Sequence, residues 1–98
     1  MSLLEQDQKQ YQLMANYLHQ FKKGQLQLDR LINVLEALLE ALQMPDEKWK
    51  ENFRSEWWTL EQVYAVALDR EQTTLSPEDH NLVIETIENI ELLLKRYL

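Results

Sequence analysis

Large apolar side chains recur every three or four residues in the middle of this chain. The series is Trp49, Phe53, Trp57, Leu60, Tyr64 and Leu68. Because an α-helix turns by about 100° per residue, this spacing places all of these side chains on one face. The segment therefore predicts a long amphipathic helix over residues 46–70. Trp58 falls outside the series, so it is either a second core contact or an exposed anchor for a partner.

The apolar residues of the N-terminal half predict two more helices. The first runs from Leu3 to Lys23 and stops at Gly24, a residue that favours the C-terminal end of a helix. Its inward side chains are expected to be Leu4, Tyr11, Met14, Leu18 and Phe21. The second runs from Leu28 to about Gln43, and its leucines cover so wide an arc that it should be buried against more than one neighbour.

Capping residues mark where the other two helices begin. Asp46 is suited to cap the helix that contains the tryptophans, while Ser76 and Pro77 give the last helix an N-cap hydroxyl and a proline in its first turn. The segment Thr59–Gln62 has the sequence of a capping box, which predicts a kink near Trp58. The inward side chains of the last helix are expected to be Val83, Ile84, Ile87, Ile90, Leu94 and Tyr97.

The composition is that of a helical protein with one core. The chain has 98 residues, only one glycine and two prolines, and a hydrophobic fraction of 45%. A core of this size needs no cross-link, and no segment shows the alternating pattern of a β-strand. We therefore predict a single all-α domain over residues 1–98, folded as a compact antiparallel bundle of four to five helices.

The net charge and the missing residue types limit the range of possible functions. Seventeen acidic against ten basic residues give a net charge of −7, which disfavours nucleic-acid phosphate and favours a basic protein partner. The absence of cysteine excludes disulfides and thiol chemistry. No apolar stretch approaches the roughly 18 residues of a membrane span. These features predict a cytoplasmic protein that binds neither nucleic acid nor membrane.

The sequence shows no catalytic or metal-binding pattern. A di-metal helical bundle uses histidines that follow a glutamate by three residues, and neither His19 nor His80 does. His80 falls near the inward face of the last helix, which predicts a neutral packing or hydrogen-bonding residue rather than a base. Glu85 and Glu88 turn away from that face, so this pair is expected to be solvated. We predict that the protein is not an enzyme and has no catalytic residue, metal site or cofactor.

Two acidic margins are the candidate binding surfaces. One lies beside the leucine arc of the second helix and holds Asp29, Asn33, Glu36 and Glu40. The other lies beside the apolar face of the third helix and holds Trp58, Glu61, Gln62, Ala65 and Asp69. Solvation alone explains either margin. Contact with a partner is the alternative interpretation, because tryptophan is enriched at interfaces where its indole nitrogen meets a partner.

The stretch from Phe53 to Asp69, with the helix start Ser76–Asp79, resembles small helical immunity proteins of bacterial toxin systems, particularly contact-dependent growth inhibition. The likeness covers about residues 45–98. It consists of the pattern Trp-x-x-Leu-Glu-x-x-Tyr-Ala, which begins at Trp57, in an acidic chain. The resemblance implies no catalytic residue. It implies tight binding to a cognate toxin domain, often a basic nuclease, whose active site or substrate groove is covered.

A self-associating structural or regulatory protein is the alternative to an immunity protein. Its contacts would run through the leucine-rich second helix and Trp58, without a toxin partner. We expect a monomer rather than a homodimer.

Overall fold

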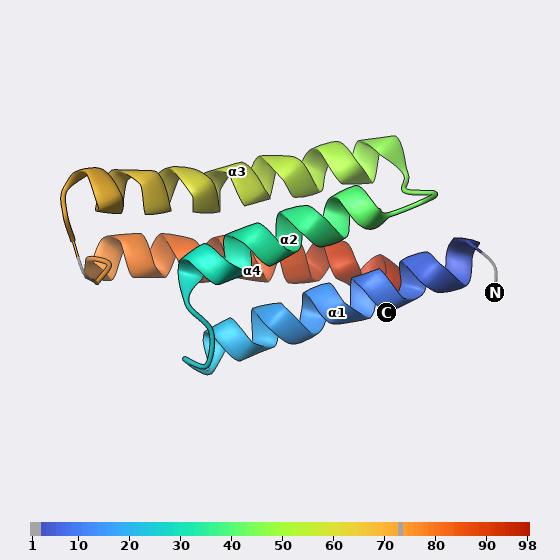
Figure 1. Cartoon of the computed structure of the whole chain (residues 1–98), viewed down its shortest axis with the longest axis horizontal. Helices are drawn as coiled ribbons and strands as arrows, with labels where there is room; N and C mark the ends of the chain where they lie inside the picture. The colour runs from blue at the N-terminus through green and yellow to red at the C-terminus, as the bar shows by residue number, and fades with distance from the viewer. Residues whose placement is uncertain (1–2, 73) are drawn as a thin grey trace.

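The apolar segments form four α-helices and a short 3₁₀ turn in this computed structural model, which describes residues 3–72 and 74–98. The elements are α1 (Leu3–Lys22), α2 (Leu28–Ala41), α3 (Glu47–Asp69), α4 (Pro77–Leu94) and the 3₁₀ turn η1 (Lys95–Tyr97). Consecutive helices run in opposite directions, and the α1–α2 link lies at the same end of the bundle as the C-terminal end of α3 (Figure 1). Each helix packs against two others, in the cyclic order α1, α2, α3, α4. The predicted all-α bundle is confirmed.

The predicted helix ends are correct to within two residues, and three of them have a local cause. The Asp46 carboxylate accepts a hydrogen bond from the backbone N–H of Trp49 at 2.9 Å, and this bond lowers the pKa of Asp46. The Ser76 hydroxyl likewise accepts from the backbone N–H of Asp79 at 3.2 Å. After α1, Gly24 has a φ of 76°, which glycine adopts without strain.

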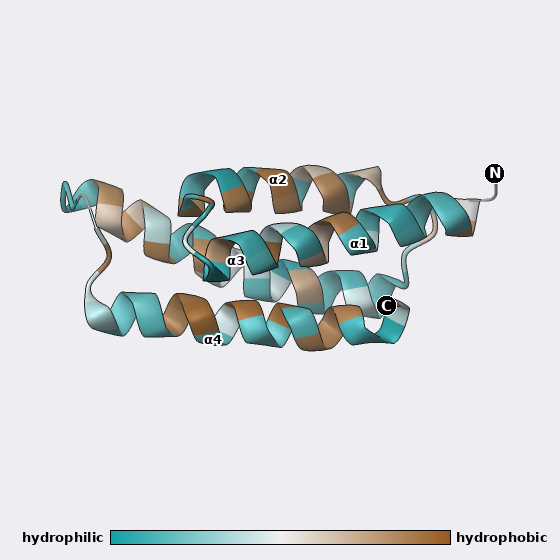
Figure 2. Cartoon of the chain, turned by 90° about the horizontal axis from the view of Figure 1, so that it is seen from below, coloured by the Kyte–Doolittle hydropathy of each residue, from teal (hydrophilic) through white to brown (hydrophobic). Residues whose placement is uncertain are grey.

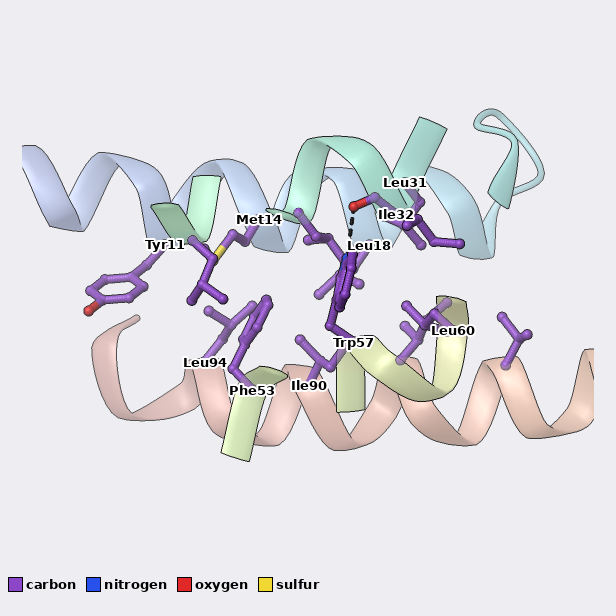
Figure 3. Close-up of a cluster of buried hydrophobic side chains, with 14 of the residues drawn as sticks. Tyr11, Met14, Leu18, Leu31, Ile32, Phe53, Trp57, Leu60, Ile90 and Leu94 are labelled. Atoms are coloured by element: carbon purple, nitrogen blue, oxygen red, sulfur yellow. Dashed lines mark hydrogen bonds between the residues drawn. The ribbon is translucent and has the colours of Figure 1, made fainter. Parts of the chain in front are cut away.

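The core is built from all four helices. Figure 2 shows polar and apolar residues sharing each helix, and Figure 3 shows apolar side chains meeting between the helices. Fully buried members are Met14 and Leu18 from α1, Leu31 and Leu35 from α2, Phe53 and Leu60 from α3, and Val83, Ile87, Ile90 and Leu94 from α4. The leucine arc of α2 is thus used inside the bundle, as its width predicted.

Trp57 stabilises the contact between α3 and α2 through a hydrogen bond as well as through packing. Its indole N–H donates to the backbone carbonyl of Ile32 at 2.9 Å (Figure 3). The side chain is only 9% exposed. Burying an indole requires an acceptor for its N–H group, and the Ile32 carbonyl supplies one from the neighbouring helix.

Two predictions for α3 are wrong. The helix has no break at Thr59, whose hydroxyl is 3.5 Å from the carbonyl of Ser55 one turn earlier and caps nothing. The buried stripe also passes through Val63 and Ala67, while Leu68 is 57% exposed. The reason is geometric, since steps of four residues advance by about 400° and drift by about 40° per step away from a fixed face. Leu68 therefore leaves the core.

Two side chains predicted to face inward at helix starts are exposed instead. Leu4 is 67% exposed, and His80 is also exposed. Both precede the first apolar buried residue of their helix, Tyr11 in α1 and Val83 in α4. Periodicity finds the face of a helix, but it does not show how far along that face the neighbouring helices extend.

Asp7 connects α1 to the link between α2 and α3, and the sequence pattern did not identify it. Its side chain is 2% exposed. Its two carboxylate oxygens accept the backbone N–H groups of Gln43 and Met44, each at 2.7 Å. These N–H groups follow the end of α2, where the chain has left its helical hydrogen bonding. A carboxylate from a distant helix thus replaces the missing acceptors.

Tyr11 packs in an aromatic cluster at the same end of the core. Its ring stacks on Tyr97 with centroids 4.1 Å apart and meets the edge of Trp49 at 5.3 Å. Burial, followed by the nearby Tyr97 and Asp7, raises the pKa of Tyr11 to about 12.

We expect this buried phenol to make the protein sensitive to alkaline pH. The unfolded chain loses the Tyr11 proton near pH 10.0, whereas the folded chain keeps it to about pH 12. Between these values the unfolded state binds fewer protons, so the free energy of unfolding should fall as pH rises from about 10 to about 12. Urea melts at pH 9, 10 and 11 measure this slope. Tyr11→Phe should reduce it, and an unchanged slope in this variant would contradict the assignment.

Candidate partner-binding surface

The pairing of α2 with α3 brings the two predicted acidic margins onto one surface. Arg54 of α3 reaches Glu40 of α2 at 2.6 Å, and the bond between Trp57 and Ile32 joins the same two helices. We call this surface the α2–α3 face. It consists of Asp29, Asn33, Glu36 and Glu40 from α2, and of Arg54, Trp58, Glu61, Gln62, Ala65 and Asp69 from α3.

Helix geometry orders the α3 side of this face. Arg54 and Glu61 are two turns apart and lie on the side that adjoins α2. Trp58 is turned by about 40° from Arg54, away from α2, and Gln62 is turned further by the same step. Glu61 is half-buried, whereas Gln62 and Asp69 are exposed. The tryptophan therefore lies between an inner and an outer group of polar side chains.

Trp58 is the large aromatic residue that the bundle leaves exposed at this face. Its exposed fraction is 54%, against 9% for its neighbour Trp57, and the two ring centroids are 6.4 Å apart. A shallow hollow beside it is lined by Glu51, Arg54 and Ser55 as well as the two indoles. In the described part of the chain, no acceptor is bound to the Trp58 indole N–H. Of the two interpretations of Trp58, burial in the core is contradicted.

The face carries five carboxylates and one guanidinium. The hydrogen bond and the charge of Arg54 lower the pKa of Glu40, so this pair is ionised but largely neutral in sum. Within residues 3–72 and 74–98, the carboxylates of Asp29, Glu36, Glu61 and Asp69 have no ion-pair partner. Both helices thus contribute unpaired negative charge to this face.

A pocket of about 670 Å³ opens at one end of the bundle, next to the α1–α2 link. We call it the end pocket, and its described lining includes Phe21, Leu28, Asp29, Tyr64, Leu68 and His80. Asp29 belongs to both the pocket and the α2–α3 face. The sequence pattern does not predict this pocket, because it is formed where the ends of all four helices meet. The sequence signal that bears on it is Leu68, which was assigned to the core and instead forms part of the pocket wall.

Three further observations concern metal ligands, buried polar atoms and membrane-spanning helices. In the described residues, no three or more His, Asp or Glu side chains gather in a way that could hold a metal ion. Every buried side-chain nitrogen or oxygen in that part of the chain has a hydrogen-bond partner. None of the helices in the described ranges is both long and apolar enough to cross a lipid bilayer.

Comparisons with known proteins do not assign the chain to a group. No family model matches the sequence, and no match is found among curated proteins or among solved structures.

Proposed function

We propose that this protein is a cytoplasmic binding module that recognises a basic protein through the α2–α3 face. The observation that carries this proposal is a half-exposed tryptophan on a face that also holds four carboxylates without ion-pair partners. Aromatic residues of this kind dominate binding energy when a partner buries them, and surrounding charge steers an oppositely charged partner to them. The net charge of −7 acts in the same direction.

We further propose that the partner is a toxin domain and that the chain is an immunity protein. In this role the carboxylates of Glu36, Glu61 and Asp69 would bind where a nuclease binds the phosphates of its substrate. Trp58 would fill a pocket beside them. Inhibition then requires only that the α2–α3 face covers the active site or substrate groove, with no chemistry from the inhibitor. The resemblance of residues 45–98 to helical immunity proteins supports this role.

Growth rescue tests the immunity role. We expect a toxin domain encoded beside this gene to arrest growth, and co-production of this chain to restore it. Arrest that persists while the two proteins bind each other would contradict immunity and retain the binding module. A toxin domain that neither binds this chain nor is neutralised by it would contradict both the immunity role and the binding module.

Charge reversal on α3 tests the α2–α3 face. We expect Glu61→Lys combined with Asp69→Lys to slow association with the basic toxin domain by about 10- to 100-fold at low salt, and by much less at high salt. Stopped-flow fluorescence measures the rate. The matched control is Glu85→Lys with Glu88→Lys, which makes the same change of charge on exposed positions of α4. Equal rates for the two double variants would exclude the α2–α3 face.

The self-associating alternative has less surface to use than the sequence suggested. The α2 leucines that would join two copies, including Leu31, Leu35 and Leu39, are buried inside one bundle. Trp58 is still exposed, and it is the remaining contact of that alternative. We expect sedimentation velocity to show a monomer whose Trp58 is accessible to acrylamide. A stable dimer in which this fluorescence is protected would favour self-association.

A further inference from the structure

The end pocket combines three aromatic rings with one carboxylate. Phe21, Tyr64 and His80 line it from α1, α3 and α4, and Asp29 lines it from the first turn of α2. Asp29 is half-buried, and no group in the described ranges forms a hydrogen bond or ion pair with its carboxylate. Leu28 and Leu68 add apolar surface. The pocket therefore offers flat rings, an apolar wall and a single negative acceptor.

We propose that the end pocket binds the guanidinium group of an arginine side chain. A guanidinium is planar and donates parallel N–H groups to one carboxylate, which suits Asp29. Its faces stack on aromatic rings, and its methylene groups pack on apolar surface. A lysine ammonium has neither the planar shape nor the paired donors. The volume of about 670 Å³ lies within the range of about 300–1,000 Å³ that is usual for ligand sites, so the residue that presents the arginine also has room.

The source of the arginine is the basic partner of the proposed function, and in this respect the inference rests on that proposal. Asp29 belongs to both the α2–α3 face and the end pocket, so one bound partner would cover both. The pocket would then act as a second anchor point at one end of the face, with Trp58 as the other. Arginine and tryptophan are the residue types that most often carry binding energy at interfaces.

Titration with small probes tests the pocket without any partner. We expect N-acetyl-arginine amide to shift the ¹H–¹⁵N NMR signals of Leu28, Asp29, Tyr64 and Ala67, with a dissociation constant in the millimolar range. N-acetyl-citrulline amide has nearly the same shape without the charge, and we expect it to bind at least tenfold more weakly. Tetramethylammonium, which lacks N–H donors, should also bind at least tenfold more weakly than the arginine probe.

Matched variants separate the pocket from the general negative charge of the protein. Asp29→Asn should weaken binding of the arginine probe at least tenfold, whereas Glu85→Gln removes the same charge at an exposed position of α4 outside the pocket and should change it less than twofold. Ala67→Leu, which adds volume to the lining, should also abolish binding. Thermal melts followed by circular dichroism establish that each variant is folded.

The opposite results would overturn the assignment. Equal affinity for arginine and citrulline probes would show that Asp29 does not recognise the cation. Equal affinity for tetramethylammonium would indicate a general cation site, and equal losses in Asp29→Asn and Glu85→Gln would indicate nonspecific attraction. Failure of growth rescue with a positive probe titration would refute the immunity role and leave the arginine pocket. Rescue with a negative titration would support the immunity role and refute the arginine pocket.

Discussion

Replacing Trp57 and Trp58 by alanine, one at a time, should give opposite results. Trp57→Ala should lower the free energy of unfolding by about 3–5 kcal/mol, because it opens a cavity in the core and removes the hydrogen bond to the Ile32 carbonyl. Trp58→Ala should cost less than about 1 kcal/mol, since half of that side chain already faces solvent. Urea denaturation followed by circular dichroism measures both values.

For binding, the two positions should rank in the other order. Folded Trp58→Ala is expected to lose at least about 2 kcal/mol of affinity for the basic toxin domain, which is about 30-fold. Trp57→Phe keeps most of the core volume and the face, so it serves as the control and should bind nearly as well as the parent. If Trp58→Ala bound with unchanged affinity, the tryptophan would have no role at the interface.

Removal of the Asp7 carboxylate should cause the second large loss of stability. We expect Asp7→Ala to cost about 2–3 kcal/mol, because two backbone N–H groups lose a charged acceptor at a junction of three segments. Asp7→Asn should recover little of the stability that Asp7→Ala loses. Each carboxylate oxygen accepts one N–H, and an amide would direct its own NH₂ group at one of these donors. Chemical denaturation again provides the measurement.

Asp69→Ala is the control for Asp7→Ala, because it also removes an aspartate from a helix but at an exposed position. It should change the free energy of unfolding by no more than about 0.5 kcal/mol. Similar effects of the two substitutions would mean that the Asp7 bonds contribute nothing beyond net charge. Amide hydrogen exchange at Gln43 and Met44 gives a second measure, and it should be faster in Asp7→Ala than in the parent.

Helix boundaries could be predicted because their causes are local. Asp46, Ser76 and Gly24 each act on groups within five residues along the chain, so the sequence alone contains the whole interaction. The capping box at Thr59 was wrong for the complementary reason. A capping residue needs free N–H groups, and within a helix held by core contacts on both sides of Thr59 these groups are already bonded.

Long-range contacts could not be predicted in this way. The Asp7 carboxylate meets atoms 36 and 37 residues away, and no periodicity connects them. The same holds for the candidate site. Both acidic margins follow from spacing within one helix, but their union depends on which helices are neighbours, and the Arg54–Glu40 contact settles that in the fold. The end pocket depends on where four helices stop, which spacing does not encode.

The unbroken course of α3 has a consequence for recognition. Its 23 residues form a rod of about 34 Å that carries both Trp58 and Tyr64. Because the core and the Asp46 cap already hold this rod in one conformation, docking would not have to freeze backbone torsions that were free beforehand. Such prior order reduces the entropic penalty of association, so a modest number of contacts along a single helix would suffice for tight and slowly reversed binding.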